Sequence, residues 1–222
     1  MLAAPELARR WLELSVDRIE RHAARLTELD AAIGDGDHGI NLKRGFAAIR
    51  EQLGSRAAAG PAPGTGGDLF ALAGRTLVST VGGAAGPLYG SFFLQLAAEL
   101  GAADVVGPGP FGHALEASAR AVGRRGRSTT GEKTMLDALV PGAEAWLATA
   151  DGSFLDRATA AARAADAGRA ATASLVATKG RASYLGERSR GHVDPGAASS
   201  ALLLEALAEA IGQMGDGDGR SR

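Results

Sequence analysis

Residues 29–41, Leu-Asp-Ala-Ala-Ile-Gly-Asp-Gly-Asp-His-Gly-Ile-Asn, separate two stretches of helical pattern and turn the chain from one into the next. Three aspartates, Asp30, Asp35 and Asp37, lie within eight residues of one another. Carboxylates this close repel one another unless a cation neutralises them, and hard cations such as Mg²⁺ take oxygen ligands. The glycines between them allow backbone angles that other residues resist, so the chain can fold around a small ion. The stretch therefore predicts a Mg²⁺-binding turn.

A helix that begins near His38 would add a second binding feature, because the free N–H groups at a helix N-terminus favour phosphate. We therefore interpret the stretch as a loop that binds Mg²⁺ and, through it, a nucleotide polyphosphate. A solvated acidic turn is the alternative interpretation, since Asp-Gly pairs are ordinary turn signals. An EF-hand is a poor match: counted from Asp35, the sixth position is Ile40 rather than Gly, and the twelfth is Phe46 rather than Glu.

The composition is typical of a folded protein with a substantial core. The chain has 222 residues, of which 45% are hydrophobic and 22% are charged, with a formal net charge of -1 and no cysteine. The near-zero charge gives no indication of nucleic-acid or membrane partners, and the lack of cysteine excludes disulfides and thiolate metal sites. The first ten residues have no signal-peptide pattern, and no apolar run reaches the ~20 residues of a membrane span. We expect a cytoplasmic protein.

Apolar residues recur at helical spacing along most of the chain. The pattern predicts eight helices, over residues 5–29, 38–53, 68–81, 88–100, 111–122, 135–149, 154–178 and 197–211. Asp68 is the expected N-cap of the third helix. Because we find neither strand alternation nor an internal repeat, we predict an all-α fold, an eight-helix antiparallel up-and-down bundle or barrel. We expect residues 1–211 to form a single domain and residues 212–222 to form a flexible tail.

In an up-and-down arrangement, alternate connections gather at one end, so those after the first, third, fifth and seventh helices meet. These connections are residues 30–38, 82–86, 126–134 and 179–196. The first is acidic, the second is glycine-rich, and the last two are basic. Taken separately, the second is typical of a tight turn and the basic ones of solvated surface, and Glu132, between Gly131 and Lys133, excludes a Walker A motif. Together they predict one composite site with a metal-binding side and a cationic, phosphate-binding side.

Four motifs follow one another along the chain: IGDGDHG at residues 33–39, GGAAGPLYG at 82–90, GEKTM at 131–135 and KGRASYLGERSRGHVDPG at 179–196. They resemble the nucleotide-binding L subunits of dihydroxyacetone kinases, of the phosphotransferase-system-dependent type. The resemblance extends from Trp11 to Ile211. The chain departs from the family's pattern at Glu132, where Asp is usual, and at Ala85, where Ser is common.

The resemblance implies an eight-helix barrel with a nucleotide at one end, and it assigns roles to residues. Asp30, Asp35 and Asp37 would bind two Mg²⁺ ions that bridge the nucleotide phosphates, and together with Arg181 they would be the catalytic residues. The implied contacts to ADP or ATP are His38, Gly39, Ile40, Asn41, Ala84, Ala85, Gly126, Met135, Arg181, Asp194, Pro195 and Gly196.

The resemblance also implies a reaction and partners. The chain would transfer a phosphoryl group from its nucleotide to dihydroxyacetone, which a separate K subunit holds covalently on a histidine. A phosphotransferase-system M subunit would then rephosphorylate the bound ADP, and a transcription regulator is a further implied partner. Three alternatives stay open: exchangeable ATP as the donor, another short ketose such as a ketotetrose as the acceptor, and a non-catalytic nucleotide-sensing module.

Overall fold

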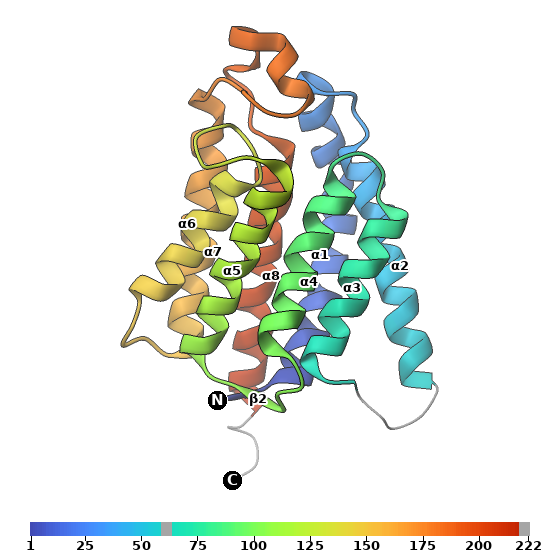
Figure 1. Cartoon of the computed structure of the whole chain (residues 1–222), viewed down its shortest axis with the longest axis vertical. Helices are drawn as coiled ribbons and strands as arrows, with labels where there is room; N and C mark the ends of the chain where they lie inside the picture. Colours follow the sequence, from blue (N-terminus) through green and yellow to red (C-terminus); the bar gives the residue numbers. More distant parts are fainter. Residues whose placement is uncertain (59–63, 218–222) are drawn as a thin grey trace.

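The computed structural model describes residues 1–58 and 64–217, and within them eight α-helices run alternately up and down a barrel (Figure 1). The helices are α1 (Ala4–Ile33), α2 (His38–Ala58), α3 (Gly66–Thr80), α4 (Ala85–Leu100), α5 (Pro108–Gly126), α6 (Leu136–Ala148), α7 (Phe154–Ala171) and α8 (Pro195–Gly217). Each helix packs against the next, and α8 packs against α1, so the ring closes. The predicted all-α up-and-down barrel is confirmed.

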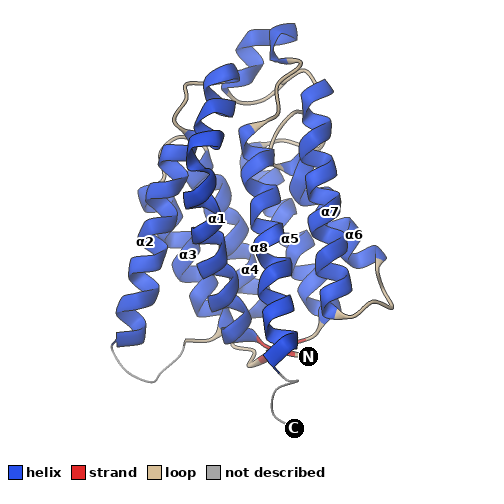
Figure 2. Ribbon diagram, turned by 180° about the vertical axis from the view of Figure 1, so that it is seen from behind, coloured by secondary structure: helices blue, strands red, loops and turns tan. Residues whose placement is uncertain are grey.

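Short elements complete the described chain. Strands β1 (Leu2–Ala3) and β2 (Val105–Val106) pair antiparallel, with Leu2 opposite Val106, and Figure 2 shows them in red at the end of the barrel that carries the N-terminus. Two 3₁₀ segments, η1 (Thr172–Ser174) and η2 (Arg181–Ser189), connect α7 to α8. The strands escaped prediction because two residues are too few to show an alternating pattern.

The helix boundaries differ from the predicted ones at several ends. Helix α1 continues to Ile33, so Asp30 lies in its last turn rather than in the loop after it. Helix α7 ends at Ala171, seven residues before the predicted end at 178. Helix α8 runs to Gly217, so residues 212–217 of the expected tail are helical, while residues 218–222 lie outside the described residues.

The start of α3 corrects one prediction. Thr65 rather than Asp68 is the N-cap, because the hydroxyl oxygen of Thr65 accepts from the Asp68 N–H at 3.1 Å. The Asp68 carboxylate accepts in return from the Thr65 N–H at 2.9 Å, which forms a capping box. The expected connector at 54–67 is thus helical at both ends, and residues 59–63 within it lie outside the described residues.

The core is centred on Trp11, which is fully buried on α1. Its ring packs edge-on against Phe70 of α3, Phe92 of α4 and Phe111 of α5, at centroid distances of 5.5, 6.4 and 6.1 Å. Its indole N–H donates to the Leu203 carbonyl oxygen of α8 at 2.7 Å. One side chain therefore contacts four other helices, and edge-on rings are a favourable aromatic geometry.

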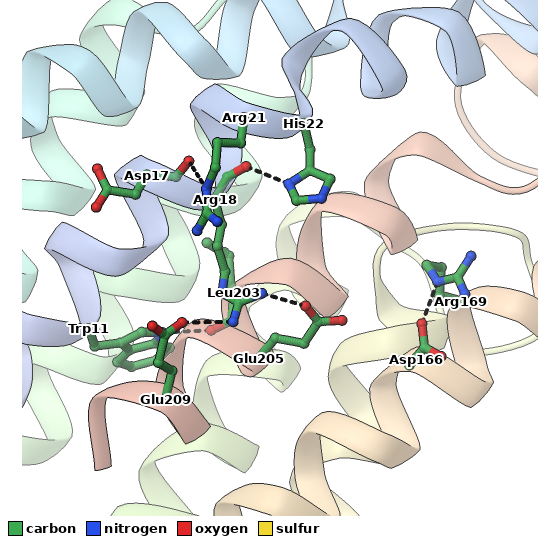
Figure 3. A network of polar contacts seen from close by, with 10 residues as sticks. All are labelled: Trp11, Asp17, Arg18, Arg21, His22, Asp166, Arg169, Leu203, Glu205 and Glu209. Atoms are coloured by element: carbon green, nitrogen blue, oxygen red, sulfur yellow. Dashed lines mark hydrogen bonds and ion pairs between the residues drawn. The ribbon is translucent and has the colours of Figure 1, made fainter. Parts of the chain in front are cut away.

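A forked ion pair closes the seam between α1 and α8 (Figure 3). The Arg18 guanidinium donates to Glu205 and to Glu209, at 2.8 Å each. The two glutamates lie one helical turn apart and would repel each other without this cation. Because the Arg18 side chain is only 21% exposed, solvent screens the pairing less than it would on an open surface.

The up-and-down topology gives the barrel two different ends. The connections after α1, α3, α5 and α7 lie at the end drawn uppermost in Figure 1. The opposite end carries the N-terminus, the two strands and the C-terminal end of α8. In the part of the chain that is described, no helix combines the length and the apolar character needed to cross a bilayer.

We predict that Trp11→Ala lowers the free energy of unfolding by about 3–5 kcal/mol, because it leaves a cavity between the surrounding helices and removes the hydrogen bond to the Leu203 carbonyl. Urea unfolding followed by circular dichroism measures the change. Leu155→Ala is the control, since Leu155 is 45% exposed, and it should cost less than about 1 kcal/mol. Equal effects of the two substitutions would contradict the central place of Trp11 in the core.

Candidate functional site

A cavity of about 370 Å³ opens at the end of the barrel where the four connections meet. Its walls come from the C-terminal end of α1, the N-terminal ends of α2, α4 and α8, and the connections that lead into α4, α6 and α8. Residues from all four predicted connections line it, so they do share one face of the molecule. The volume is within the range of small-molecule sites.

The acidic side of the cavity is formed by Asp30, Asp35 and Asp37. One carboxylate oxygen from each lies within 4.8 Å of those of the other two. The Asp30 carboxylate accepts from the N–H groups of Asp37 at 2.8 Å and His38 at 3.1 Å, which folds the connection back over the end of α1. A Cβ atom on Gly34 would lie 2.2 Å from the same carboxylate, so any side chain there would displace Asp30 from this position. Three converging hard oxygen donors fit Mg²⁺.

A cation reaches this cluster from the opposite wall. The Arg181 guanidinium, at the start of η2, lies 2.9 Å from the Asp35 carboxylate. Arg181 also lines the cavity. The connection between α7 and α8 therefore extends across the mouth of the barrel to the acidic side.

Of the four residues predicted as contacts in the first turn of α2, two line the cavity and two do not. His38 and Asn41 line the cavity, whereas Gly39 and Ile40 do not. Gly39 faces α1 so closely that a Cβ atom would lie 2.0 Å from the Ala23 carbonyl oxygen, and Ile40 is 60% exposed. Successive helical residues point about 100° apart, so four in a row cannot all face one cavity.

His38 belongs to a buried hydrogen-bond chain that sequence reasoning missed. Its Nε2 lies 2.9 Å from the Ser199 hydroxyl of α8, which lies 2.6 Å from the Tyr89 hydroxyl of α4. Burial lowers the pKa of His38, against the opposing effect of Asp30 and Asp37. Burial also raises the pKa of Tyr89 to about 12. A neutral phenol and a neutral imidazole thus hold the starts of α2, α4 and α8 together.

A further part of the cavity lining is apolar. The predicted residues Ala84, Ala85, Gly126 and Met135 all belong to it, together with Leu88. A Cβ atom on Gly86 would lie 2.3 Å from the Val81 carbonyl oxygen, so a glycine lets α4 start tight against the preceding turn. Small side chains leave room for a flat aromatic group.

The start of α8 completes the cavity with Asp194, Pro195 and Gly196. The Asp194 carboxylate accepts from the Ala197 N–H at 2.7 Å, which is the geometry of an N-cap. Asp194 is 8% exposed, and burial raises the pKa of its carboxyl to about 7. All the predicted site residues except Gly39 and Ile40 therefore line one cavity.

Asp137 in the first turn of α6 and Lys133 in the connection before it have roles that the sequence did not reveal. Asp137 accepts from the Gly131 N–H at 2.5 Å and the Thr134 N–H at 2.7 Å, and it thereby shapes the loop. Lys133 was expected in a basic, phosphate-binding loop, but its side chain is only 1% exposed and its ammonium group donates to backbone carbonyls. No periodicity distinguishes such a lysine from a solvated one.

Fold and site together define a class: an all-α barrel whose open end carries a cavity lined by an acidic cluster, which could hold a metal ion, and by apolar residues. Residues 32–209 match the DAK2 domain, and this chain belongs to the DAK2 domain family. That membership places it among the phosphotransferases.

The relatives agree with this family. The chain is 42% identical over 200 residues to "PEP-dependent dihydroxyacetone kinase 1, ADP-binding subunit DhaL" of Listeria innocua, covering 90% of this chain and 93% of the relative. It is 39% identical over 206 residues to "PTS-dependent dihydroxyacetone kinase, ADP-binding subunit DhaL" of Lactococcus lactis, covering 90% and 95%. The chain is thus similar to these L subunits over nearly their whole length.

A solved structure has the same fold. The dihydroxyacetone kinase of C. freundii in complex with AMP-PNP and Mg²⁺ superposes with a TM-score of 0.65 at 30% sequence identity. The match covers 90% of this chain and 33% of that one, so the barrel corresponds to about a third of the larger protein.

We predict that Asp194→Asn becomes more stable relative to the unsubstituted protein as the pH rises from 5 to 8. The folded state holds a proton on Asp194 that the unfolded chain releases near the ordinary value of 3.8, so ionising this carboxyl costs stability up to about pH 7. The asparagine cannot ionise, and the difference should grow by up to about 1.4 kcal/mol per pH unit. Urea unfolding at each pH measures it. A pH-independent difference would argue against a protonated Asp194.

Proposed function

We propose that this chain is the nucleotide-binding subunit of a dihydroxyacetone kinase, and that it passes the terminal phosphoryl group of a Mg²⁺-bound nucleotide to dihydroxyacetone held on a separate K subunit. The observation that carries the proposal is the composition of one cavity, whose lining combines three converging carboxylates with a group of apolar residues. A nucleotide matches this combination, since its phosphates need cations and its base needs an apolar slot. The relatives that are named ADP-binding subunits support this assignment.

The acidic residues suit the phosphate end. Asp30, Asp35 and Asp37 would hold two Mg²⁺ ions, which neutralise phosphate oxygens and orient the transferring group. Arg181, already 2.9 Å from Asp35, is placed to donate to a phosphate oxygen in the forked geometry that guanidinium groups favour. The backbone N–H groups of His38 and Asn41 already donate to Asp30 and Asp37. The other backbone N–H groups of this first turn, those of Gly39 and Ile40, would add donors for a phosphate.

The remaining predicted residues suit the nucleoside end. Ala84 and Ala85 would approach the base from one side, and Gly126 and Met135 from the other. Residues 194–196 would close the site at the start of α8. We propose that residues 1–211 act as a single domain, because all four connections of the ring contribute to the one cavity.

Phosphoryl transfer requires mainly that the protein position the reacting groups and neutralise the charge on the phosphate oxygens. In phosphoryl transfer the bond from phosphorus to the nucleotide oxygen breaks as a hydroxyl oxygen of the ketose attacks, with the two oxygens in line. Arg181 and the N–H groups of α2 would hold the phosphates for that attack, and the carboxylates would do so through bound Mg²⁺. His38 need not carry the phosphoryl group, because its ring already contacts the Ser199 hydroxyl.

For the donor, we propose that ADP stays bound as a coenzyme and that an M subunit of a phosphotransferase system rephosphorylates it. The relatives named PEP-dependent and PTS-dependent support this form over exchange of free ATP. The barrel mouth would then receive two partners in turn.

We predict that Asp35→Asn and Asp37→Asn each abolish measurable phosphoryl transfer to dihydroxyacetone, because one fewer anionic ligand weakens the hold on Mg²⁺. The assay combines the purified chain with candidate K and M subunits and phosphoenolpyruvate. Asp151→Asn is the matched control, since Asp151 is exposed in the α6–α7 turn at the other end of the barrel, and it should keep full activity. Transfer that survives in both site variants would disprove the metal assignment.

We predict that the purified protein carries ADP. Mass spectrometry of the denatured protein should release close to one ADP per chain, and prolonged dialysis against EDTA should remove it because the metal bridges are lost. A nucleotide-free preparation that binds ATP only transiently would favour the exchangeable-ATP alternative instead.

A further inference from the structure

Lys133 is a fully enclosed cation at the mouth of the barrel, and the proposed chemistry does not use it. Its side chain is 1% exposed. The ammonium group donates to the carbonyl oxygens of Thr172 at 2.5 Å and Leu175 at 3.3 Å, and also to that of His192. An ammonium group has three donors and no acceptor, so these three carbonyls satisfy it completely.

The three carbonyls bracket the segment that crosses the cavity. Thr172 and Leu175 belong to η1 and the residue after it, where the chain leaves α7. His192 lies at the other end of the crossing, two residues before Asp194. The chain between these anchors, residues 176–191, carries Arg181. A single side chain thus binds both ends of the segment that places Arg181 opposite Asp35.

Other contacts of the same loop reinforce this arrangement. The Glu132 carbonyl oxygen accepts from the Thr178 N–H at 3.3 Å, and its carboxylate lies 3.8 Å from the Lys179 ammonium group. The Asp194 N–H donates to the Thr172 hydroxyl at 3.0 Å, which joins the two anchor points directly. The α7–α8 connection therefore packs against the α5–α6 connection and is held by hydrogen bonds and an ion pair to it.

The backbone of Lys133 indicates that its side chain is needed here. Its φ is +61°, in the left-handed region that favours glycine. Burial lowers the pKa of the ammonium group, while Asp194 and Asp137 favour its charged form. A strained backbone and a desolvated charge are both unfavourable, and the three carbonyl bonds offset them.

We propose that Lys133 is a positioning residue for the nucleotide site. Its ammonium group acts like a bound structural cation: it binds the chain at both ends of residues 176–191. These bonds keep Arg181 and Asp194 in place at the cavity. The inference rests on the proposed function only in that a nucleotide is the ligand. Lys133 is among the residues that line the cavity, but its ammonium group already donates to three carbonyl oxygens, so the proposed role acts through Arg181 and Asp194.

The test is the affinity for Mg·ADP of Lys133→Met, measured by isothermal titration on protein stripped of nucleotide. We expect a loss of about 10- to 100-fold, the range typical when a residue that orients a binding group is removed. Hydrogen exchange of residues 176–191 in the nucleotide-free protein should become at least about tenfold faster, whereas exchange in α3 stays unchanged. Lys43→Met is the control: Lys43 is half exposed on α2, 3.4 Å from Glu20 and outside the cavity lining, and both measurements should stay within about twofold.

A double substitution separates positioning from general destabilisation. If Lys133 acts through Arg181, the loss in Lys133→Met/Arg181→Met should stay within about threefold of the larger single loss, because the second change removes an interaction that is already weakened. Losses that multiply would overturn the inference. If Lys133→Met does not fold, Lys133→Arg replaces it, since a planar guanidinium cannot direct its donors at three converging carbonyls and the same selective loss is expected.

The two proposals fail differently. An unsubstituted protein that binds no Mg·ADP would overturn the proposed function. Normal binding by the unsubstituted protein together with unchanged affinity and unchanged exchange in Lys133→Met would overturn only the positioning role.

Discussion

The site depends on one carboxylate oxygen that accepts two backbone N–H groups. Asp30, in the last turn of α1, receives the N–H groups of Asp37 and His38, and these bonds reverse the chain within four residues. The reversal brings Asp35 and Asp37 beside Asp30 and starts α2 next to them. The contact that ends one helix and begins the next therefore also assembles the acidic cluster. The repulsion among the three carboxylates is the electrostatic cost of this turn, and a divalent cation removes it.

Closure of the helix ring then builds the site from segments that are far apart in the sequence. Eight helices that alternate in direction place four connections at the same end, and the packing of α8 on α1 fixes their distance across the mouth. Trp11 and Arg18 both act on this seam, through Leu203 and through the two glutamates of α8. Arg181 can approach Asp35 because the barrel is closed, although the two residues are far apart in the sequence. Stability of the core and geometry of the site are thus linked.

The helical fold and the meeting of four connections at one end could be predicted from the sequence. The spacing of apolar residues indicates which residues face the core, and the alternating direction of the helices indicates which connections lie together. Asp30, Asp35, Asp37 and Arg181 were predicted from charge, glycine spacing and family resemblance, and they do converge on one cavity. Gly39 and Ile40 were assigned with their neighbours but are not among the residues that line the cavity, because the helical rotation points Gly39 at α1 and the Ile40 side chain at solvent.

Other features depend on tertiary contacts that leave no local pattern. Nothing near Lys133 in the sequence indicates that three carbonyls from the α7–α8 connection surround it, and nothing near Tyr89 indicates a serine of α8. The end of α7 was predicted too late because its alanine-rich pattern continues past Ala171. In the structure the helix ends there, and the following 3₁₀ segment η1 provides a carbonyl oxygen that accepts from Lys133 instead. These misses lie where distant segments meet.

The placement of the two chain ends has a consequence for architecture. The first strand and the far end of α8 both lie at the end of the barrel away from the cavity (Figures 1 and 2). Helix α8 has 23 residues and thus spans about 35 Å at 1.5 Å per residue. A module joined to the N-terminus or beyond the end of α8 would begin at the end of the barrel opposite the cavity, and would not cover the cavity's opening. A fused domain that had to face the mouth would need a tether long enough to run back along the whole height of the helices.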